Sequence, residues 1–489
     1  MKKFEKPLEY VKKIQSWYEK ETGKTFFNLV EESNEWNKEN QEKKQICCID
    51  LALEELLDKI LLKKSDETIL FAKEKELPLL SVMNRYYQPS KINLDAKIEE
   101  LSIDDMVNLH NCLSYSQYDK YLLIHYNEIG IWTNSCIPRC SDRWNIYDEF
   151  LKECRSVILD LKTMKIISLP FAKFRNLNES EDYSLTIIQE KIKDAKLIEF
   201  ADKLDGSFIQ MRYIADKNLW NGILVSTSGS VNSFKNFHLQ SVLKWLNKFG
   251  ENYRKFCNEY SDYTCIFEWI HPTDKHIVSY DESQIGLHLV GMRNVKTGEL
   301  KSYKEIITLA NTFELQCTTL YSETLNSILS KLDDFESTEK EGWVLNIDGF
   351  LVKIKCNEFT EMFKIIQDSS SFNTILRCYT NNTLDDIIAK VPESCKDFIY
   401  EKVNKIVTSE QKFFNVIDKY TVQIPVNLNR KEVIDWIKKQ VPKKLQPYVI
   451  AKYVGKSIEF LVRHKDTNCP SYLKEKEIDN WLEYLQKLE

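Results

Sequence analysis

The middle of the chain, from about residue 115 to residue 365, consists of short apolar runs with polar segments between many of them. Examples of the runs are "KYLLIHY", "RSVILDL", "SFIQMRYI", "YTCIFEWI" and "GFLVKIKC", and two of the separators are "NLNESED" and "NVKTGEL". Short runs rich in β-branched and aromatic residues are typical of strands. One helical stretch, "FKNFHLQSVLKWLNKF", lies among them, so the pattern predicts an α+β domain.

The two ends of the chain have a different, helical pattern. "PLEYVKKIQSWYEK" and "CIDLALEELLDKILLKK" near the start carry apolar residues three and four apart, and "CKDFIYEKVNKIV" and "KEVIDWIKKQV" do so near the end. We therefore predict three domains: a helical extension of unknown role over residues 1–105, the α+β domain over 106–365, and an all-α domain over 366–489.

Composition limits the environment and the partners of the chain. The formal net charge is -6 over 489 residues, so any nucleic-acid site must concentrate its basic groups in a groove. The first residues, "MKKFEKPLEYVKK", contain no apolar signal segment, and no stretch reaches the length of a membrane span. Thirteen cysteines without a C-x-x-C pair do not suggest a disulfide framework. We expect an intracellular, cytoplasmic protein with reduced thiols and no membrane contact.

A zinc site is a weak alternative use of the cysteines. Cys136, Cys140 and Cys154, with His110 and Cys112 upstream, are the residues that such a site would use. Their spacing fits no standard zinc pattern.

The stretch "FADKLDGSFI" places Lys203, Asp205, Gly206 and Ser207 close together. A strand that ends in an Asp-Gly turn would explain these residues without any chemistry. A lysine here could also act as a nucleophile, provided that neighbouring cations and a metal ion lower its pKa and free its lone pair. Gly206 would then let the backbone approach a nucleotide.

Downstream residues could neutralise a phosphate chain. Lys353 and Lys355 are two apart in a predicted strand, so their side chains share one face. Glu341 opens the strand before and could hold a metal or a substrate hydroxyl. Cations of this kind are needed when a nucleophile attacks a nucleoside triphosphate and pyrophosphate leaves.

Four segments in order resemble the motifs of the covalent nucleotidyltransferases, which include DNA ligases, RNA ligases and capping enzymes. They are "KLDGS" at 203–207, "IFEW" at 266–269, "EGWV" at 341–344 and "VKIK" at 352–355. Further segments resemble the phage-type RNA ligase 1 family in particular: "HYN" at 125–127, "ECR" at 153–155, "PFAKFRNLNE" at 170–179, "HPTDKHIV" at 271–278, and an Asp-Asp pair after the last motif. The resemblance covers roughly residues 115–400 and implies a nucleotidyltransferase domain of antiparallel sheets and helices.

The resemblance also assigns roles. It implies that Lys203 is the residue that becomes adenylylated, with ATP and Mg²⁺, or Mn²⁺ in its place, as cofactors. The implied ATP contacts are Tyr126, Arg155, Lys173, Asp205, Gly206, Glu268, Glu341, Lys353 and Lys355, and the implied metal ligands are Asp385 and Asp386.

Two positions depart from the family pattern. The family lysine in the segment after the first motif falls on Ser228, within "STSGS", so one phosphate contact is lost or is supplied from elsewhere. Ser156 stands where the family usually has glycine.

Each site residue has an ordinary structural alternative. Glu268 could form a cross-strand ion pair, and Arg155 could pair with Asp160. Lys353 and Lys355 could form a solvated strand face, and the Asp385–Asp386 pair could cap a helix.

The N-terminal extension holds a second acidic pattern. Glu32 with Glu35, and then Glu55 with Asp58, resemble the metal-binding signature of the all-α nucleotide pyrophosphohydrolases. A helical docking or packing module is the other interpretation, because acidic residues are common on helix surfaces.

Together these features predict an ATP-dependent RNA ligase that joins 5′-phosphate and 3′-hydroxyl ends, with broken tRNA among its substrates. A DNA ligase or capping enzyme, or an inactive nucleic-acid binding protein of ligase fold, are the alternatives. No kinase or phosphatase signature is evident, so a separate end-healing partner is expected.

Overall fold

The computed structural model describes most of the chain. The described residues are 2–40, 45–61, 98, 101–126, 150–231, 236–272, 274, 276–381, 383–388, 391, 393–464 and 471–488. They divide into two compact units. The first comprises residues 1–274, 280–332 and 342–355, and the second comprises 275–279, 333–341 and 356–489.

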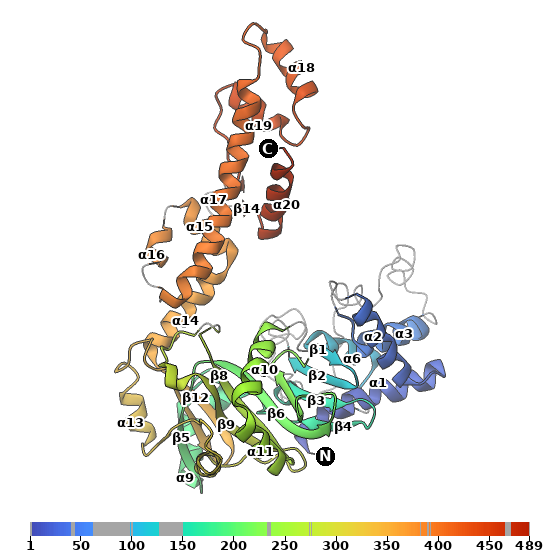
Figure 1. The fold of residues 1–489 in the computed structure, drawn as a ribbon, viewed down its shortest axis with the longest axis vertical. Helices are drawn as coiled ribbons and strands as arrows, with labels where there is room; N and C mark the ends of the chain where they lie inside the picture. Colours follow the sequence, from blue (N-terminus) through green and yellow to red (C-terminus); the bar gives the residue numbers. More distant parts are fainter. Residues whose placement is uncertain are drawn as a thin grey trace. The chain divides into compact units, whose positions relative to one another are not determined.

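Three four-stranded antiparallel sheets form the centre of the first unit (Figure 1). One has the order β1-β2-β3-β4, built from Leu113–Tyr118, Tyr121–Tyr126, Arg155–Asp160 and Lys165–Ser168. The next has the order β7-β6-β8-β9, built from Gly222–Thr227, Ser207–Asp216, Tyr263–Ile270 and Gly286–Asn294. The last has the order β10-β5-β11-β12, built from Leu320–Tyr321, Ile198–Asp202, Gly342–Ile347 and Phe350–Lys355.

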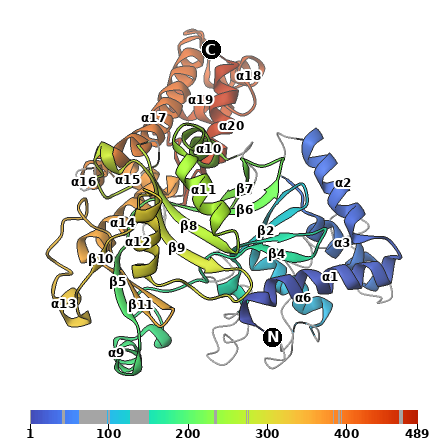
Figure 2. The ribbon, with the colours of Figure 1, turned by 60° about the horizontal axis from the view of Figure 1, so that its bottom comes forward.

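Helices cover these sheets, as the turned view shows (Figure 2). α10 (Phe237–Phe249) contacts β7, α11 (Glu251–Glu259) contacts β6 and β7, and α12 (Tyr303–Thr312) contacts β9. Two further helices, α9 (Leu185–Asp194) and α13 (Leu325–Ser330), also belong to this unit. Mixed helices and antiparallel sheets, with helices at both ends of the chain, confirm the predicted α+β class.

The N-terminal helices do not form a unit of their own. α1 (Lys6–Thr22), α2 (Phe26–Glu39), α3 (Cys48–Leu61) and α6 (Ile103–Asn111) share one hydrophobic core with β1–β4. α1 buries Tyr10, Val11, Ile14 and Tyr18 along one face, as their three- and four-residue spacing requires. No boundary between the compact units therefore falls near residue 105, where we expected one.

The second unit is mainly helical. Its elements are α14 (Asn357–Ser370), α15 (Phe372–Thr380), α16 (Leu384–Ile388), α17 (Glu393–Val422), α18 (Arg430–Gln440), α19 (Gln446–Tyr453) and α20 (Glu475–Gln486). The aromatic rings of Phe413, Tyr448, Phe460 and Trp481 pack together in its core. A two-stranded sheet of β13 (Val462–His464) and β14 (Ser471–Tyr472) interrupts the helices, so this part of the chain is not purely α-helical.

Candidate active site

Lys203 directly follows β5 and is tied to the neighbouring strand. Its backbone N–H donates a hydrogen bond to the carbonyl oxygen of Gly342 at 3.0 Å. Gly342 lies opposite Lys355 in the β11–β12 pair. The predicted nucleophile and one predicted phosphate-binding lysine therefore meet at the same end of one sheet.

Gly342 is needed where these strands meet. Its φ is +147°, and a Cβ at this position would lie 2.1 Å from the carbonyl oxygen of Ile354. Only glycine permits both the backbone conformation and the close approach of β12. The glycine of "EGWV" thus sets the distance between the Lys203 turn and the strand that carries Lys355.

Two side chains, one on β8 and one later in the chain, accept hydrogen bonds from the turn after Lys203. The N–H of Asp205 donates to the Tyr280 hydroxyl at 2.7 Å, and the N–H of Gly206 donates to Glu268 Oε1 at 3.2 Å. A Cβ on Gly206 would lie 2.6 Å from the carbonyl oxygen of Trp269. The backbone at Gly206 therefore lies close to β8. The approach of Gly206 to a nucleotide stays a prediction.

Arg155, the first residue of β3, carries a charge with an unsatisfied donor. Its Nη1 is buried and has no hydrogen-bond partner among the described residues. Burial lowers the pKa of Arg155, although Tyr126 and Glu268 nearby act in the opposite direction. Leaving a buried donor of a charged group unpaired is costly, so this guanidinium suits an anionic ligand.

Asp160 is not the structural partner that Arg155 could have had. Its Oδ1 accepts hydrogen bonds from the backbone N–H groups of Lys162 and Thr163, and it thereby stabilises the turn after β3.

Arg155 and Lys353 share one aromatic neighbour. The Arg155 guanidinium carbon lies 5.1 Å from the centroid of the Phe174 ring, and Lys353 Nζ lies 4.8 Å from the same centroid. Two cations around one ring repel each other, and a phosphate group would offset that repulsion. Lys353 and Lys355 are both half-buried, which disagrees with the alternative of a solvated strand face.

The segment that carries Phe174 runs along β12. Lys353 donates its N–H to the carbonyl oxygen of Arg175 at 3.0 Å, and its own carbonyl oxygen accepts from the N–H of Leu177 at 2.8 Å. Glu179 closes the segment with hydrogen bonds from the backbone and side chain of Asn176 at 2.8 and 2.7 Å. "KFRNLNE" is therefore paired with the strand that carries the two predicted phosphate-binding lysines.

Tyr126 and Lys173 also lie together. Lys173 Nζ is 4.5 Å from the centroid of the Tyr126 ring, and the His125 ring stacks on Tyr126 at 4.5 Å between centroids. Burial lowers the pKa of His125 to about 4, and the charges of Arg155 and Lys173 lower it further. His125 is accordingly neutral near pH 7.

The remaining predicted residues belong to the second unit. Glu341 directly precedes β11 and is buried, and Asp385 is exposed on α16. The side chain of Asp386 lies outside the described residues. Within the described ranges, no group of three His, Cys, Asp or Glu residues is placed to hold a metal ion.

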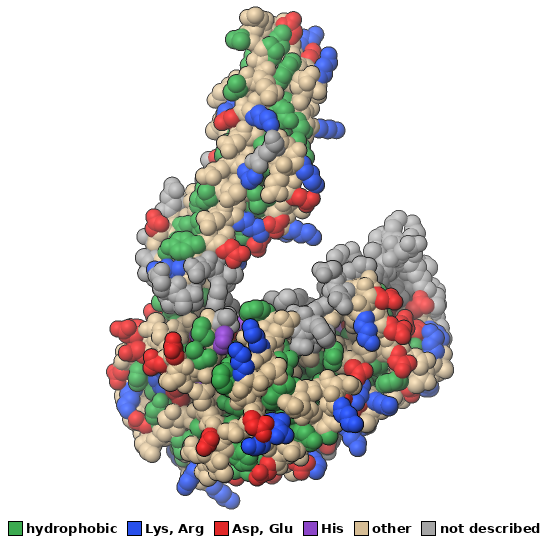
Figure 3. All heavy atoms as spheres, viewed as in Figure 1, with side chains coloured by type: hydrophobic (Ala, Val, Ile, Leu, Met, Phe, Trp, Pro, Cys, Tyr) green, Lys and Arg blue, Asp and Glu red, His purple; other side chains and the backbone are tan. Residues whose placement is uncertain are grey.

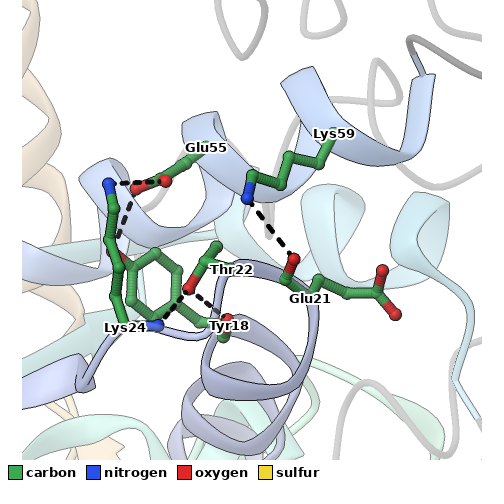
Figure 4. Close-up of polar contacts among 6 residues, drawn as sticks. All are labelled: Tyr18, Glu21, Thr22, Lys24, Glu55 and Lys59. Atoms are coloured by element: carbon green, nitrogen blue, oxygen red, sulfur yellow. Dashed lines mark hydrogen bonds and ion pairs between the residues drawn. The ribbon is translucent and has the colours of Figure 1, made fainter.

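The N-terminal acidic pattern does not form a metal site in the described part of the chain. Glu55 accepts hydrogen bonds from Lys24 Nζ at 2.8 Å and from the Tyr18 hydroxyl at 2.9 Å (Figure 4). Glu32, Glu35 and Asp58 do not join it in a cluster of three carboxylates. The core that these helices share with β1–β4 supports the helical packing interpretation.

The alternative zinc site cannot be assembled from the described residues. Cys136 and Cys140 lie outside them, while Cys112 and Cys154 are buried and are not joined in a disulfide. His110 hydrogen-bonds with Tyr115 and pairs with Asp50 at 3.0 Å.

Comparison with known proteins identifies the central segment. Residues 153–367 match a family model described as RNA ligase. This segment matches the phage T4 RNA ligase 1 family. The match confirms the resemblance that the ordered motifs predicted.

Individual relatives of RNA ligase type are distant. A viral protein described as a bifunctional polynucleotide kinase/RNA ligase, from Autographa californica nuclear polyhedrosis virus, is 30% identical over 165 residues. The match spans 30% of this chain and only 22% of that relative.

Two solved structures show a limited likeness. An archaeal ATP-dependent RNA ligase has a TM-score of 0.33 and 12% identity, over 66% of this chain and 83% of that one. A lysine-to-alanine mutant of Naegleria gruberi RNA ligase with ATP and Mn has a TM-score of 0.30 and 16% identity, over 39% and 57% of the two chains.

Four residues at this site received no role from the sequence: His125, Ser156, Phe174 and Tyr280. Phe174 stands inside a segment that carries the family resemblance, and Tyr280 follows another such segment by two residues. Only the fold shows which charged or backbone groups they contact. An aromatic residue among cations was the available signal for Phe174.

Proposed function

We propose that this chain is an ATP-dependent RNA ligase that works through a covalent lysyl-AMP intermediate. The observation that carries the proposal is the convergence of Arg155 and Lys353 on Phe174, beside the sheet end where Lys203 meets Lys355. The RNA ligase match over residues 153–367 supports the same reaction class.

The proposed reaction has three steps. Neutral Lys203 Nζ attacks the α-phosphorus of ATP, forming a P–N bond as the bond to pyrophosphate breaks. A 5′-phosphate oxygen of RNA then attacks the same phosphorus, which forms RNA-adenylate and releases the lysine. Finally, a 3′-hydroxyl attacks the RNA 5′-phosphorus, the new phosphodiester bond forms, and AMP leaves.

The chain's cations serve each step in the same way. Nearby positive charge lowers the pKa of a lysine and frees its lone pair. Arg155, Lys173, Lys353 and Lys355 would hold phosphate oxygens and stabilise the charge that develops on the leaving group. Glu268, Asp205, Gly206, Tyr126 and Glu341 complete the proposed ATP contacts.

A divalent metal is part of this proposal. Mg²⁺, or Mn²⁺ in its place, would neutralise phosphate oxygens when bound. Mg²⁺ in phosphate sites commonly keeps several waters and uses one or two carboxylates, a role that Asp385 and Asp386 would fill.

Helices α18 and α19 of the second unit offer a surface for RNA. Residues 430–456 contain eight Lys and Arg residues and two acidic residues. Lys438, Lys439 and Lys443 are exposed there, and Figure 3 shows Lys and Arg side chains on the surface of the C-terminal helices. Phosphate contacts from such a surface would position a folded RNA such as a broken tRNA without reading its sequence.

The cellular setting follows from the reaction. RNA ends without a 5′-phosphate or 3′-hydroxyl would need a separate kinase or phosphatase, and the viral relative joins kinase and ligase in its name.

No helix in the described part of the chain is long and apolar enough to cross a membrane. We propose a cytoplasmic location, where ATP and RNA are both present.

Two incubations test the proposal. With α-labelled ATP and Mg²⁺, the wild-type protein should become labelled and the Lys203→Ala protein should not. Labelled ends then separate the alternatives: a broken RNA stem-loop with 5′-phosphate and 3′-hydroxyl ends should be sealed better than nicked duplex DNA. Efficient sealing of the DNA nick without RNA sealing would favour a DNA ligase, and absence of any covalent label would favour an inactive binding protein.

A further inference from the structure

Ser156 occupies a bulge beside the proposed ATP site. In the β2–β3 pair, Ile124 lies opposite Val157 and His125 lies opposite Arg155, so Ser156 is the unpaired residue between them. Its φ is 66°, in the left-handed region that favours glycine. Bulges of this kind are frequent next to active sites, where they redirect a neighbouring side chain. Here that neighbour is Arg155.

The Ser156 side chain forms specific hydrogen bonds, and their free energy could outweigh the cost of its unfavourable backbone conformation. It is fully buried, and its Oγ–H donates to the carbonyl oxygen of Ser228 at 2.6 Å. His125 Nδ1 lies 3.0 Å from the same Oγ, and the Ser156 carbonyl oxygen accepts from Gln210 Nε2 at 2.7 Å. One residue thereby joins β2, β6 and the end of β7.

These contacts fix the tautomer and the orientation of the His125 ring. Because the Ser156 hydroxyl hydrogen is used on Ser228, Nδ1 of the neutral ring must donate to Ser156 Oγ. The ring is then held in one orientation against Tyr126, whose other neighbour is Lys173. A continuous series of contacts runs from the loop after β7, through Ser156 and His125, to two of the proposed ATP contacts.

We propose that Ser156 is a positioning residue for ATP: its hydroxyl fastens the His125–Tyr126 stack to the loop at Ser228 and so fixes the wall of the site that carries Arg155 and Lys173. The inference rests on the proposed ligase function. It also connects the two departures from the family pattern, because Ser156 bonds directly to the backbone of Ser228, whose own side chain is exposed.

The test is Ser156→Gly in the full-length chain. Glycine accepts the left-handed backbone without strain, so the variant should fold while it loses both hydroxyl contacts. We expect the KM for ATP in self-adenylylation to rise about tenfold, with little change in the maximal rate, because the affected residues bind ATP before and during the reaction. Ser156→Ala, which keeps the Cβ, should show the same rise in KM.

A matched control separates this effect from the loss of any buried serine. Ser409 is fully buried and donates its hydroxyl to the carbonyl oxygen of Ile406 at 2.7 Å, in α17 of the other unit. Ser409→Ala should leave the KM for ATP unchanged.

A double variant tests the route through His125. His125→Asn removes the ring that stacks on Tyr126 and should also raise the KM. Since both changes break one series of contacts, the Ser156→Gly/His125→Asn protein should be no worse than His125→Asn alone.

Three outcomes distinguish the possibilities. A wild-type protein that takes no AMP overturns the proposed function, and this inference falls with it. If the wild type is labelled and folded Ser156→Gly has the wild-type KM, the inference alone is overturned. Independent, multiplying effects of the two substitutions would also overturn it.

Discussion

The backbone N–H of Lys203 donates a hydrogen bond to the carbonyl oxygen of Gly342 at 3.0 Å, and Gly342 lies opposite Lys355. Lys203, the proposed nucleophile, is thus anchored through its backbone. The position of its side chain depends on the turn that follows. That turn is held by Tyr280 and Glu268. In phosphoryl-type transfer, positioning of the reacting groups is a major source of the rate enhancement.

Tyr280→Phe should slow self-adenylylation. The change removes only the hydroxyl that accepts the Asp205 N–H, and an unsatisfied amide at a partly buried site costs about 1–3 kcal/mol. If the same free energy is lost in the transition state, the rate of adenylylation falls about tenfold or more. Single-turnover labelling with ATP measures it.

Tyr253→Phe is the matched control for Tyr280. Its hydroxyl donates to the carbonyl oxygen of Leu287 at 2.8 Å, in the same unit. It should lower the thermal midpoint without slowing adenylylation. Equal rates for both variants and the wild type would contradict the role of Tyr280 in holding the turn.

Lys353→Ala and Lys355→Ala should each reduce adenylylation far more than they reduce stability. A lysine that contacts phosphate in an active site contributes strongly to the rate of the reaction, whereas an exposed lysine contributes little to the free energy of unfolding. Lys191 provides the control, because its Nζ lies 4.8 Å from the Phe350 ring, the same distance as Lys353 from Phe174. Lys191→Ala should leave the rate unchanged, and wild-type rates in all three variants would restore the view of an ordinary strand face.

His125 predicts a pH dependence of stability. Its folded pKa of about 4 lies below the usual value of 6.5, because of burial first and then of Arg155 and Lys173. The unfolded chain therefore binds a proton as the pH falls below 6.5, while the folded chain does not until about 4, so the free energy of unfolding decreases across that window.

The comparison is with His125→Gln, which lacks the titrating group. Between pH 7 and pH 4 the wild type should lose roughly 1–3 kcal/mol more stability than the variant, as denaturant titrations would show. Parallel pH profiles for the two proteins would show that His125 is not held neutral by its surroundings.

Lys438→Ala/Lys439→Ala should weaken sealing of a broken RNA stem-loop while the reaction of ATP with Lys203 continues. The two exposed lysines would each contribute a phosphate contact, so the slope of log affinity against log salt should become shallower by about one per contact. Lys487→Ala, which removes an exposed lysine paired with Glu483 on α20, is the control. An unchanged salt slope in the double variant would place RNA docking elsewhere.

The sequence predicted the parts of the site that lie within single strands or turns. The common face of Lys353 and Lys355 follows from strand periodicity. Both side chains are half-buried, and Lys353 lies with Arg155 near Phe174. The class of the fold likewise follows from short apolar runs between helical ends.

Contacts between distant segments could not be predicted in this way. The bond of Ser156 to Ser228 and the pairing of Arg175 with Lys353 depend on which strands become neighbours, which periodicity does not encode. The shared core of the N-terminal helices and β1–β4 was missed for the same reason: an amphipathic face shows that a helix packs, but not against what.

The central claim is that Lys203 forms a covalent bond to AMP, and peptide mapping by mass spectrometry tests it most directly. The full-length protein is incubated with ATP and Mg²⁺, digested at a pH that preserves the P–N bond, and searched for an AMP adduct. We predict one adduct on the peptide that contains Lys203 and none in the Lys203→Ala protein. An AMP adduct on another residue, or an adduct that persists in Lys203→Ala, would contradict the account.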